Sequence, residues 1–409
     1  MKIWIRYGAG IGLGLVLGAL LPTGGGDTTA LFSQLSLIVI QLGRVFLMPM
    51  AFFAAIIAAD ELRSDRRLLR TIGVSFGTLM VVLLIAALVA VLAILVLQPQ
   101  RIPPMVQEGR IAEPPAVLDR LIGSLPANSF RLLVLGDNAL FAVLAMGVLV
   151  GLTLGFDREI TSPVSLVADS ANRVLYRLNS WMTEIYGLLL IVPTVLMVLW
   201  MRETDDLQLF GQFLLVTVTA ALLLGVVVFP LVIYLLGRRE ARPLAWIHRM
   251  TPAALAALAT GDVFVSLSTY ARSALESHGV PRRVGGVVPP LMAVFGRLGT
   301  ALVSIASFLL VIRSYTALEI SGSAVFQLAV TGLLYSFMLG RSPAGGVALL
   351  LSYIAVRYGR GMEEAYLILL PVMPALERIG AWLDVMTIGF VTQLVSMLGG
   401  TTRGQERPI

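Results

Sequence analysis

Charged side chains interrupt the apolar C-terminal third of this 409-residue chain. A charge at the centre of a bilayer costs about 2.5–3.5 kcal/mol on insertion scales, so such residues persist where they pair or face water. In that setting carboxylates bind cations or carry protons, and guanidinium groups bind anions. The candidates for this chemistry are Asp262, Arg297, Arg341, Glu377 and Asp384.

Two broken apolar stretches must position these residues. The first covers 252–279 and breaks at 260–262; the second covers 323–358 and breaks at 340–346. At helical pitch, segments 325–339 and 347–356 rise roughly 22 and 15 Å, whereas a bilayer core is roughly 30 Å thick. Broken helices survive at membrane depth where protein or water satisfies the freed backbone groups. Two such breaks indicate a transporter's binding site, so we predict two re-entrant helical hairpins.

The composition is that of an integral membrane protein. Mean hydropathy is +0.89 and only 13% of residues are charged, whereas soluble domains carry about 25%. The net charge of +6 comes mainly from arginine, which suits loops facing anionic lipid rather than a nucleic-acid surface. There is no cysteine and there are two histidines, so no metal site or cofactor is predicted. No HExxH or GxSxG motif supports an enzyme.

Hydropathy predicts an all-α, multi-pass protein with eight transmembrane helices besides the hairpins. The predicted helices are 4–21, 31–59, 72–98, 130–156, 166–201, 207–236, 284–313 and 365–398. A polar segment occupies 99–125. Arginines gather in the loops at 60–71, 158–177, 238–249 and 282–283, all on one side of this topology. The positive-inside rule then places both termini in the cytoplasm, and we expect the cytoplasmic (inner) membrane of a bacterium.

The C-terminal half is organised as an inverted repeat. A hairpin followed by a helix (252–313) precedes a second hairpin followed by a helix (323–398), and the two hairpins open from opposite sides. This arrangement is typical of secondary transporters that hold their solute at the repeat interface.

At this level the chain resembles the dicarboxylate/amino-acid:cation symporters, which include archaeal aspartate transporters and excitatory amino-acid transporters. The run 47–53 (LMPMAFF) is similar to the family's MPLVF, and 126–130 (PANSF) to PxNxF. Gly299-Thr300-Ala301 resembles the end of NMDGTA, and 343–346 (PAGG) resembles VPGAG. Their order and spacing, together with the hairpins, extend the resemblance over nearly the whole chain.

The resemblance implies a homotrimer in the lipid bilayer that works as an elevator. Its rigid scaffold would comprise 1–71 (helices 1 and 2) and 99–201 (a loop and helices 4 and 5). Its moving transport domain would comprise 72–98 (helix 3), 207–236 (helix 6) and the core 243–398, followed by a cytoplasmic tail, 399–409. The second hairpin would be the outer gate, at Pro343, Ala344 and Gly345. The predicted substrate-binding residues are Thr260, Gly261, Asp262, Arg297, Thr300, Arg341, Ser342, Gly346, Glu377 and Asp384.

Departures from the family pattern concern the coupling ion. Gly296-Arg297-Leu298 replaces Asn-Met-Asp, and Thr260-Gly261-Asp262 replaces a serine-rich tip. In helix 8 we align Glu377 with the family's first Asp, Gly380 with its carboxylate-clamping Arg, and Asp384 with its Asn. Sodium ligands are therefore lost, and a fixed guanidinium at Arg297 can replace a cation without being released. Proton coupling through Glu377 or Asp384 is the alternative to Na⁺, because carboxyl groups removed from water take up protons more readily. A further alternative is that transport is not coupled to an ion, or that the protein only exchanges one solute for another.

Structural interpretations compete with these roles. Arg297 can pair internally with Glu377 or Asp384, Arg341 can extend to external water, and Asp262 can cap the second arm of its hairpin. Arg378 points about 100° away from Glu377 on its helix and is left out of the site. The predicted function is secondary transport of a small organic solute, an amino acid or a carboxylate. The alternatives are an anion channel and a non-transporting membrane scaffold.

Overall fold

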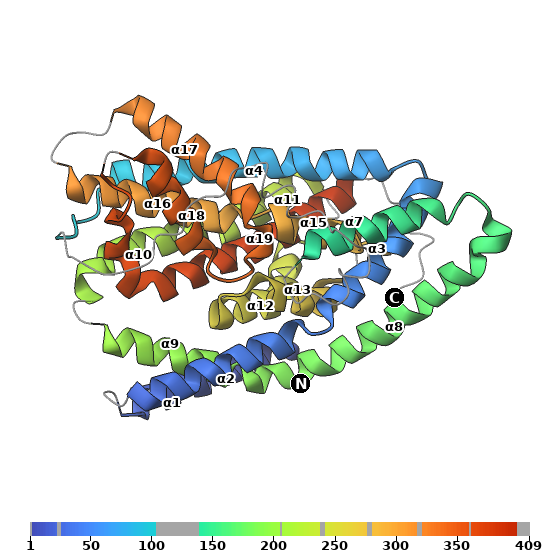
Figure 1. The fold of residues 1–409 in the computed structure, drawn as a ribbon, viewed down its shortest axis with the longest axis horizontal. Helices are drawn as coiled ribbons and strands as arrows, with labels where there is room; N and C mark the ends of the chain where they lie inside the picture. Colours follow the sequence, from blue (N-terminus) through green and yellow to red (C-terminus); the bar gives the residue numbers. More distant parts are fainter. Residues whose placement is uncertain are drawn as a thin grey trace.

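The computed structural model describes residues 2–22, 26–103, 139–204, 207–237, 242–275, 280–316, 321–359 and 361–398. Their regular secondary structure is entirely helical, which confirms the all-α prediction (Figure 1). The predicted tail, most of the 99–125 segment and the PANSF motif lie outside these ranges.

Eight helical stretches among these residues are long and apolar enough to cross a membrane. They are Ile3–Leu20, Asp27–Ser64, Leu68–Leu97, Arg158–Glu203, Leu207–Gly237, Arg282–Tyr315, Gly322–Arg341 and Ala365–Leu398. Seven of them overlap predicted membrane helices. Gly322–Arg341 is the first arm of the second hairpin, and this arm is longer than predicted. The predicted helix 130–156 is described only from residue 139, where α7 spans Leu140–Thr153.

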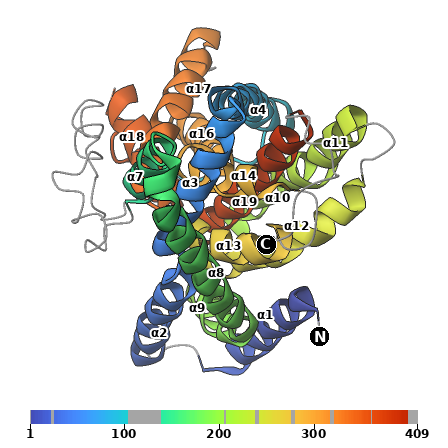
Figure 2. The ribbon, with the colours of Figure 1, turned by 90° about the vertical axis from the view of Figure 1, so that its right-hand side faces the viewer.

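Four N-terminal and central helices form a separate layer, α1 (Ile3–Leu20), α2 (Gly26–Arg44), α8 (Arg158–Leu189) and α9 (Ile191–Glu203). Both α1 and α2 pack on α8 and α9. In Figure 1 and Figure 2, α1, α2 and α9 lie along the lower edge, and α8 runs from them towards α7. The buried Tyr186 side chain joins α8 to α2 by donating to the Val39 carbonyl over 3.1 Å.

The helix predicted at 31–59 is two helices, α2 and α3 (Leu47–Ser64). The physical reason is Pro49, whose ring clashes with the carbonyl of residue 45 and which has no N–H to continue the helix. Pro49 is tolerated in the first turn of α3, where N–H groups lack intrahelical partners anyway. α3 then packs against α7 and α8.

The main hydrophobic core gathers around α4 (Leu68–Leu97), α16 (Leu298–Tyr315) and α19 (Met373–Leu398). The segment predicted as helix 6 is α10 (Leu207–Leu222), a π-helical turn (Leu223–Val228) and α11 (Phe229–Gly237). A π turn just before Pro230 accommodates a residue that cannot donate its backbone hydrogen bond.

Two helix pairs fold back on themselves at the positions where the sequence predicts breaks. The first pair is α12 (Pro243–Thr260) and α13 (Val263–Tyr270), extended by a π turn (Ala271–Leu275); the second is α17 (Gly322–Ser336) and α18 (Gly346–Tyr358). A 3-10 turn, Phe337–Arg341, ends the first arm of the second pair. Gly261 and Gly345 have φ of +68° and +72°, a conformation that glycine adopts without a Cβ penalty.

The helix predicted over 284–313 is broken twice, into α14 (Arg282–Gly285), α15 (Val288–Phe295) and α16. The second break falls at Gly296 and Arg297, immediately before α16. A short 3-10 helix (Ala365–Val372) precedes α19. The chain thus presents several helix N-termini in its interior, and the polar residues there must satisfy them.

Candidate functional site

The tip of the first hairpin is stabilised largely by its own side chains. Asp262 is fully buried and caps α13, because its Oδ1 accepts from the Val265 N–H over 2.8 Å. The Thr260 hydroxyl accepts from the Asp262 N–H over 3.2 Å. The capping role considered in the sequence analysis is therefore present.

Asp262 also has a partner that the sequence did not reveal. Its Oδ2 lies 3.6 Å from Nη1 of Arg44, at the end of α2, and has no hydrogen-bond partner in the described structure. This ion pair joins the first hairpin to the α1–α2–α8–α9 layer. Arg44 lies more than two hundred residues earlier in the chain, so no local pattern could have identified it.

The tip of the second hairpin is held mainly by residues from other elements. The Pro343 carbonyl accepts from the Val263 N–H over 3.1 Å, so the two tips touch. The Ser342 carbonyl accepts from Nη2 of Arg297 over 3.0 Å. Ala344 is exposed, whereas Arg341 is half-buried in the 3-10 turn.

Arg297 and Asp384 form the centre of the site. Both side chains are buried, with 2% and 0% exposure, and Nε of Arg297 lies 3.4 Å from Oδ2 of Asp384. Asp384 also caps α16, accepting from the N–H groups of Gly299 (2.6 Å) and Thr300 (3.0 Å) and from the Thr300 hydroxyl (2.6 Å). A carboxylate at a helix N-terminus is favoured by the helix dipole. Asp384 thus balances both the guanidinium and the helix end.

Glycine at position 346 allows α18 to approach Arg297 closely. A Cβ there would lie 2.4 Å from Nη2 of Arg297, which is far inside van der Waals contact. The start of α18 therefore lies directly against the Arg297 guanidinium. Of the predicted residues, Arg297, Thr300, Ser342, Gly346 and Asp384 come together here, and Thr260, Gly261 and Asp262 join them through the tip-to-tip hydrogen bond.

Glu377 satisfies the N-terminus of a different helix, as Asp384 does for α16. Its Oε1 accepts from the Ala348 N–H over 2.8 Å in the first turn of α18. The seven-residue spacing on α19 thus directs two acids to two neighbouring helix N-termini, α16 and α18. Glu377 connects α19 to the second hairpin, and Asp384 connects it to the broken helix 7.

Arg378 is the residue that sequence reasoning set aside. It is 6% exposed, donates to the Pro374 carbonyl of its own helix over 2.8 Å, and stacks over the Trp200 ring at 5.8 Å. Its Cγ would lie 3.7 Å from a Cβ on Gly261, so it adjoins the first tip. Among the residues whose placement is described, no carboxylate lies within ion-pairing distance, and its Nε lacks a hydrogen bond. Burial is the feature that distinguishes Arg378 from the arginines of the loops. Burial depends on the folded structure, so the sequence pattern did not reveal it.

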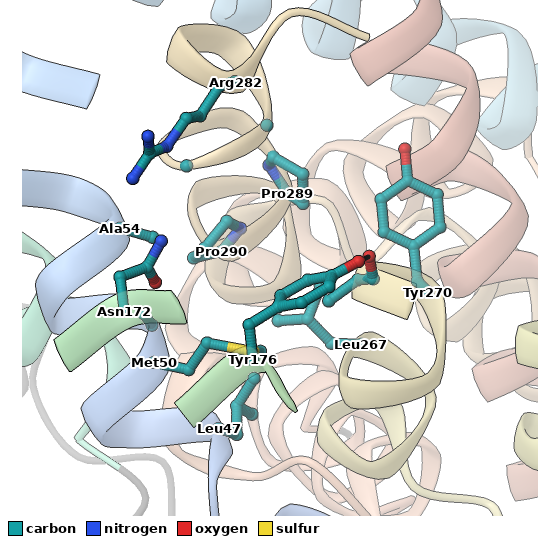
Figure 3. A pocket seen from close by; sticks show the side chains of 14 residues that line it. Leu47, Met50, Ala54, Asn172, Tyr176, Leu267, Tyr270, Arg282, Pro289 and Pro290 are labelled. Carbon is teal, nitrogen blue, oxygen red and sulfur yellow. Dashed lines mark hydrogen bonds between the residues drawn. The ribbon is translucent and has the colours of Figure 1, made fainter. Parts of the chain in front are cut away.

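A cavity of about 50 Å³ lies away from the tips, between α3, α8, α13 and α15 (Figure 3). Its lining includes Asn172, Tyr176 and Arg282. Pockets for organic ligands are usually about 300–1,000 Å³, so this cavity is too small to be the solute site. Within the described ranges, no group of three or more His, Cys, Asp or Glu could hold a metal ion.

Comparison with known families assigns the chain to one of them. The model of the sodium:dicarboxylate symporter family matches residues 3–398. The chain therefore belongs to this family, which confirms the resemblance stated from its motifs and indicates a multi-pass membrane protein and a secondary transporter. The comparison with curated proteins found no match.

Proposed function

We propose that this chain transports a small organic solute bearing a carboxylate, an amino acid or an organic acid, without using Na⁺ as the coupling ion. The observation that carries the proposal is the position of Arg297. Its guanidinium lies between the Asp384 carboxylate and the Ser342 carbonyl, and oxygen atoms of these two kinds are the ligands that hard cations prefer. A covalently held cation occupies this position and cannot be released during a transport cycle.

The same contacts close the second hairpin without a bound ion. Arg297 holds its tip and Glu377 holds the first turn of α18. Charge-assisted hydrogen bonds of this kind contribute roughly 1.5–3 kcal/mol each. We infer that the hairpins are re-entrant, that the second is a gate, and that closure depends on these internal contacts. Energy then comes from protons, through Glu377 or Asp384, or from exchange of one solute for another.

The solute's charge follows from Arg378. A buried guanidinium without a carboxylate is costly, because burying an ion requires several kcal/mol that a partner of opposite charge offsets. Arg297 is already paired with Asp384, whereas Arg378 adjoins the first tip and makes no ion pair within 4 Å among the described residues. We assign the solute carboxylate to Arg378, with Arg341 at the second tip as the further basic residue. Thr260, Gly261, Thr300 and Gly346 complete the proposed site.

The moving parts follow the predicted division. Helices α4, α10, α11 and the segment 243–398 would move as an elevator against α1, α2, α3, α7, α8 and α9, in a homotrimer in the bacterial inner membrane. The tip-to-tip bond between the hairpins supports their movement as one body.

Counterflow in proteoliposomes tests this proposal. Vesicles loaded with unlabelled amino acids or carboxylates are placed in the labelled compound, in Na⁺-free choline buffer at pH 5.5 and 7.5. We expect saturable accumulation of a carboxylate-bearing compound without Na⁺ and at least a tenfold loss in Arg378→Gln, since tenfold corresponds to about 1.4 kcal/mol. The control is Arg357→Gln, which removes the same charge from an exposed arginine near the end of α18. Accumulation that requires Na⁺ would contradict the proposal.

A further inference from the structure

A line of ion pairs crosses the boundary between the first hairpin and the helices facing it. We call it the polar seam. Its hairpin side, which here means the first hairpin together with α14 after it, contains Asp262, Arg272, Arg282 and Arg283. Facing them are Arg44, Glu184, Asp169 and Asp65, respectively. The Arg272–Glu184 pair is 2.6 Å long and the Arg44–Asp262 pair 3.6 Å. The four facing residues come from three helices or their ends, α2, α8 and α3.

The charges of the seam are segregated. In three of the four pairs the arginine lies on the hairpin side and the carboxylate on the facing side, and the order is reversed only at the tip, at Asp262. Arg6 of α1 adds a second cation to Glu184, at 3.6 Å. Because of this segregation, oppositely charged residues face one another in one relative position of the two surfaces. A shift of one surface along the other would separate these pairs.

Neutral hydrogen bonds follow the same line. The Tyr7 and Thr269 hydroxyls share a bond of 3.2 Å, the Asn179 amide donates to the Ser268 carbonyl over 2.9 Å, and the Tyr176 hydroxyl donates to the Ala271 carbonyl over 2.7 Å. All three cross from α1 or α8 to the second arm of the first hairpin. The boundary is therefore held largely by directional polar contacts.

Apolar packing between the first hairpin and α1, α2 and α8 is limited, whereas Leu47 and Met50 of α3 belong to the main core together with Leu267 of the hairpin. The hydrophobic cluster there receives only small side chains from the hairpin, Ala256, Ala259 and Val265, together with Leu255 at its edge. The cavity of Figure 3 lies in this boundary, and Oδ1 of Asn172 on its wall lacks a hydrogen-bond partner. Protein interiors are otherwise close-packed. Polar and incompletely packed boundaries are typical of parts that move relative to one another.

We propose that the polar seam is a releasable latch that holds the first hairpin against α1, α2, α3 and α8 in one state of the protein. The inference rests on the proposed transport function for its purpose, since a fixed structure needs no latch. Opening the latch separates all four ion pairs together, and the segregated charges bring the surfaces back into the same register.

Hydrogen–deuterium exchange of the purified protein without solute tests the latch. Asp65 and Arg283 are suitable, because both lie at helix ends and the Asp65 side chain is 43% exposed. Either reversal, Asp65→Arg or Arg283→Asp, places like charges together. We expect exchange in 263–275 and in the α8 peptides facing it to rise about fivefold, which is the Boltzmann factor of the 1 kcal/mol upper value for an exposed pair. The double variant, with the charges exchanged, is expected to return to the wild-type rate.

Two controls make the result specific to the seam. Arg357→Asp changes the charge by the same amount at an exposed position near the end of α18, outside the seam, and is expected to leave 263–275 unchanged. Peptides of the buried α16 report general loss of folding; if a reversal affects them, the neutral variants Asp65→Asn and Arg283→Gln replace it. Unchanged exchange in both single variants, or a double variant as fast as the singles, would overturn the latch. Because no solute is present, the result is independent of the counterflow experiment.

Discussion

The two hairpin tips solve the same structural problem in different ways. Each must satisfy the N-terminus of a helix that begins inside the protein, and each turns at a glycine with positive φ. The first tip uses its own Asp262 as the cap. The second has no side-chain cap of its own at Gly345 and relies on Glu377, Arg297 and the first tip. A tip that caps itself stays folded when its surroundings move, whereas one held from outside opens when those contacts are released.

Removing Asp384 is expected to have the largest effect. Asp384→Ala leaves α16 uncapped and Arg297 buried without its carboxylate, and breaking a buried ion pair costs about 3–5 kcal/mol. The melting temperature of the purified protein should fall accordingly. Asp384→Asn, which keeps an acceptor oxygen but not the charge, should lose less. A melting temperature unchanged in Asp384→Ala would mean that this carboxylate does not hold the two helices together.

Removing Arg297 is expected to affect the second tip much more than the first. Arg297→Met deletes the bond to the Ser342 carbonyl and should loosen the second tip while leaving Asp262 on its cap. The chain has no cysteine, and Val347 in the first turn of α18 is fully buried, so a single thiol at Val347→Cys reports opening by its rate of alkylation. The loss of a charge-assisted bond worth roughly 1.5–3 kcal/mol predicts a rate increase of about tenfold or more. Equal alkylation rates in the Val347→Cys protein with and without the Arg297→Met substitution would show that this contact does not restrain the gate.

Removing Asp262 tests the self-capped tip. Asp262→Ala should cost about 1–2 kcal/mol, the usual value for an N-cap, with an added cost from Arg44, which loses its buried partner. The melting temperature should fall, but the alkylation rate of a thiol at position 347 should change much less than in Arg297→Met. Asp262→Asn keeps the cap and serves as the control. A larger opening of the second tip in Asp262→Ala than in Arg297→Met would reverse the comparison.

Matched glycine substitutions should give the smallest effects. A Cβ at Gly345 meets no atom within 4 Å, and one at Gly261 only makes ordinary contact with Arg378. Each alanine therefore costs mainly the strain of positive φ, about 1–2 kcal/mol. Melting temperatures of Gly261→Ala and Gly345→Ala should therefore be similar. Clearly unequal melting temperatures would show that backbone strain is not what the two positions share.

The fold was largely predictable because its signals are local. Hydropathy locates the long helices, and glycine beside polar residues locates the turns at Gly261 and Gly345. Pro49, which divides the predicted helix 31–59, was also visible but was outweighed by the continuous apolar pattern. The broken helix 7 was missed for the same reason, since Gly296 and Arg297 interrupt the pattern only briefly.

The partners within the site were less predictable, because they arise from tertiary packing. The spacing of Glu377 and Asp384 placed them on one face of α19 but did not show that they cap α18 and α16. Arg44 and Arg378 carried no signal, since one ends an apolar helix far from the hairpins and the other follows a residue that was already assigned. Their importance lies in what surrounds them after folding.

The measurement that tests the central claim most directly is solute binding as a function of Na⁺. Isothermal titration of the purified protein with the solute found by counterflow would be made in choline buffer and in increasing Na⁺. If Arg297 replaces the cation, the dissociation constant stays the same from zero to about 100 mM Na⁺, as it does in added K⁺. A dissociation constant that falls steadily with Na⁺, and not with K⁺, would show that a sodium site persists and would contradict the account.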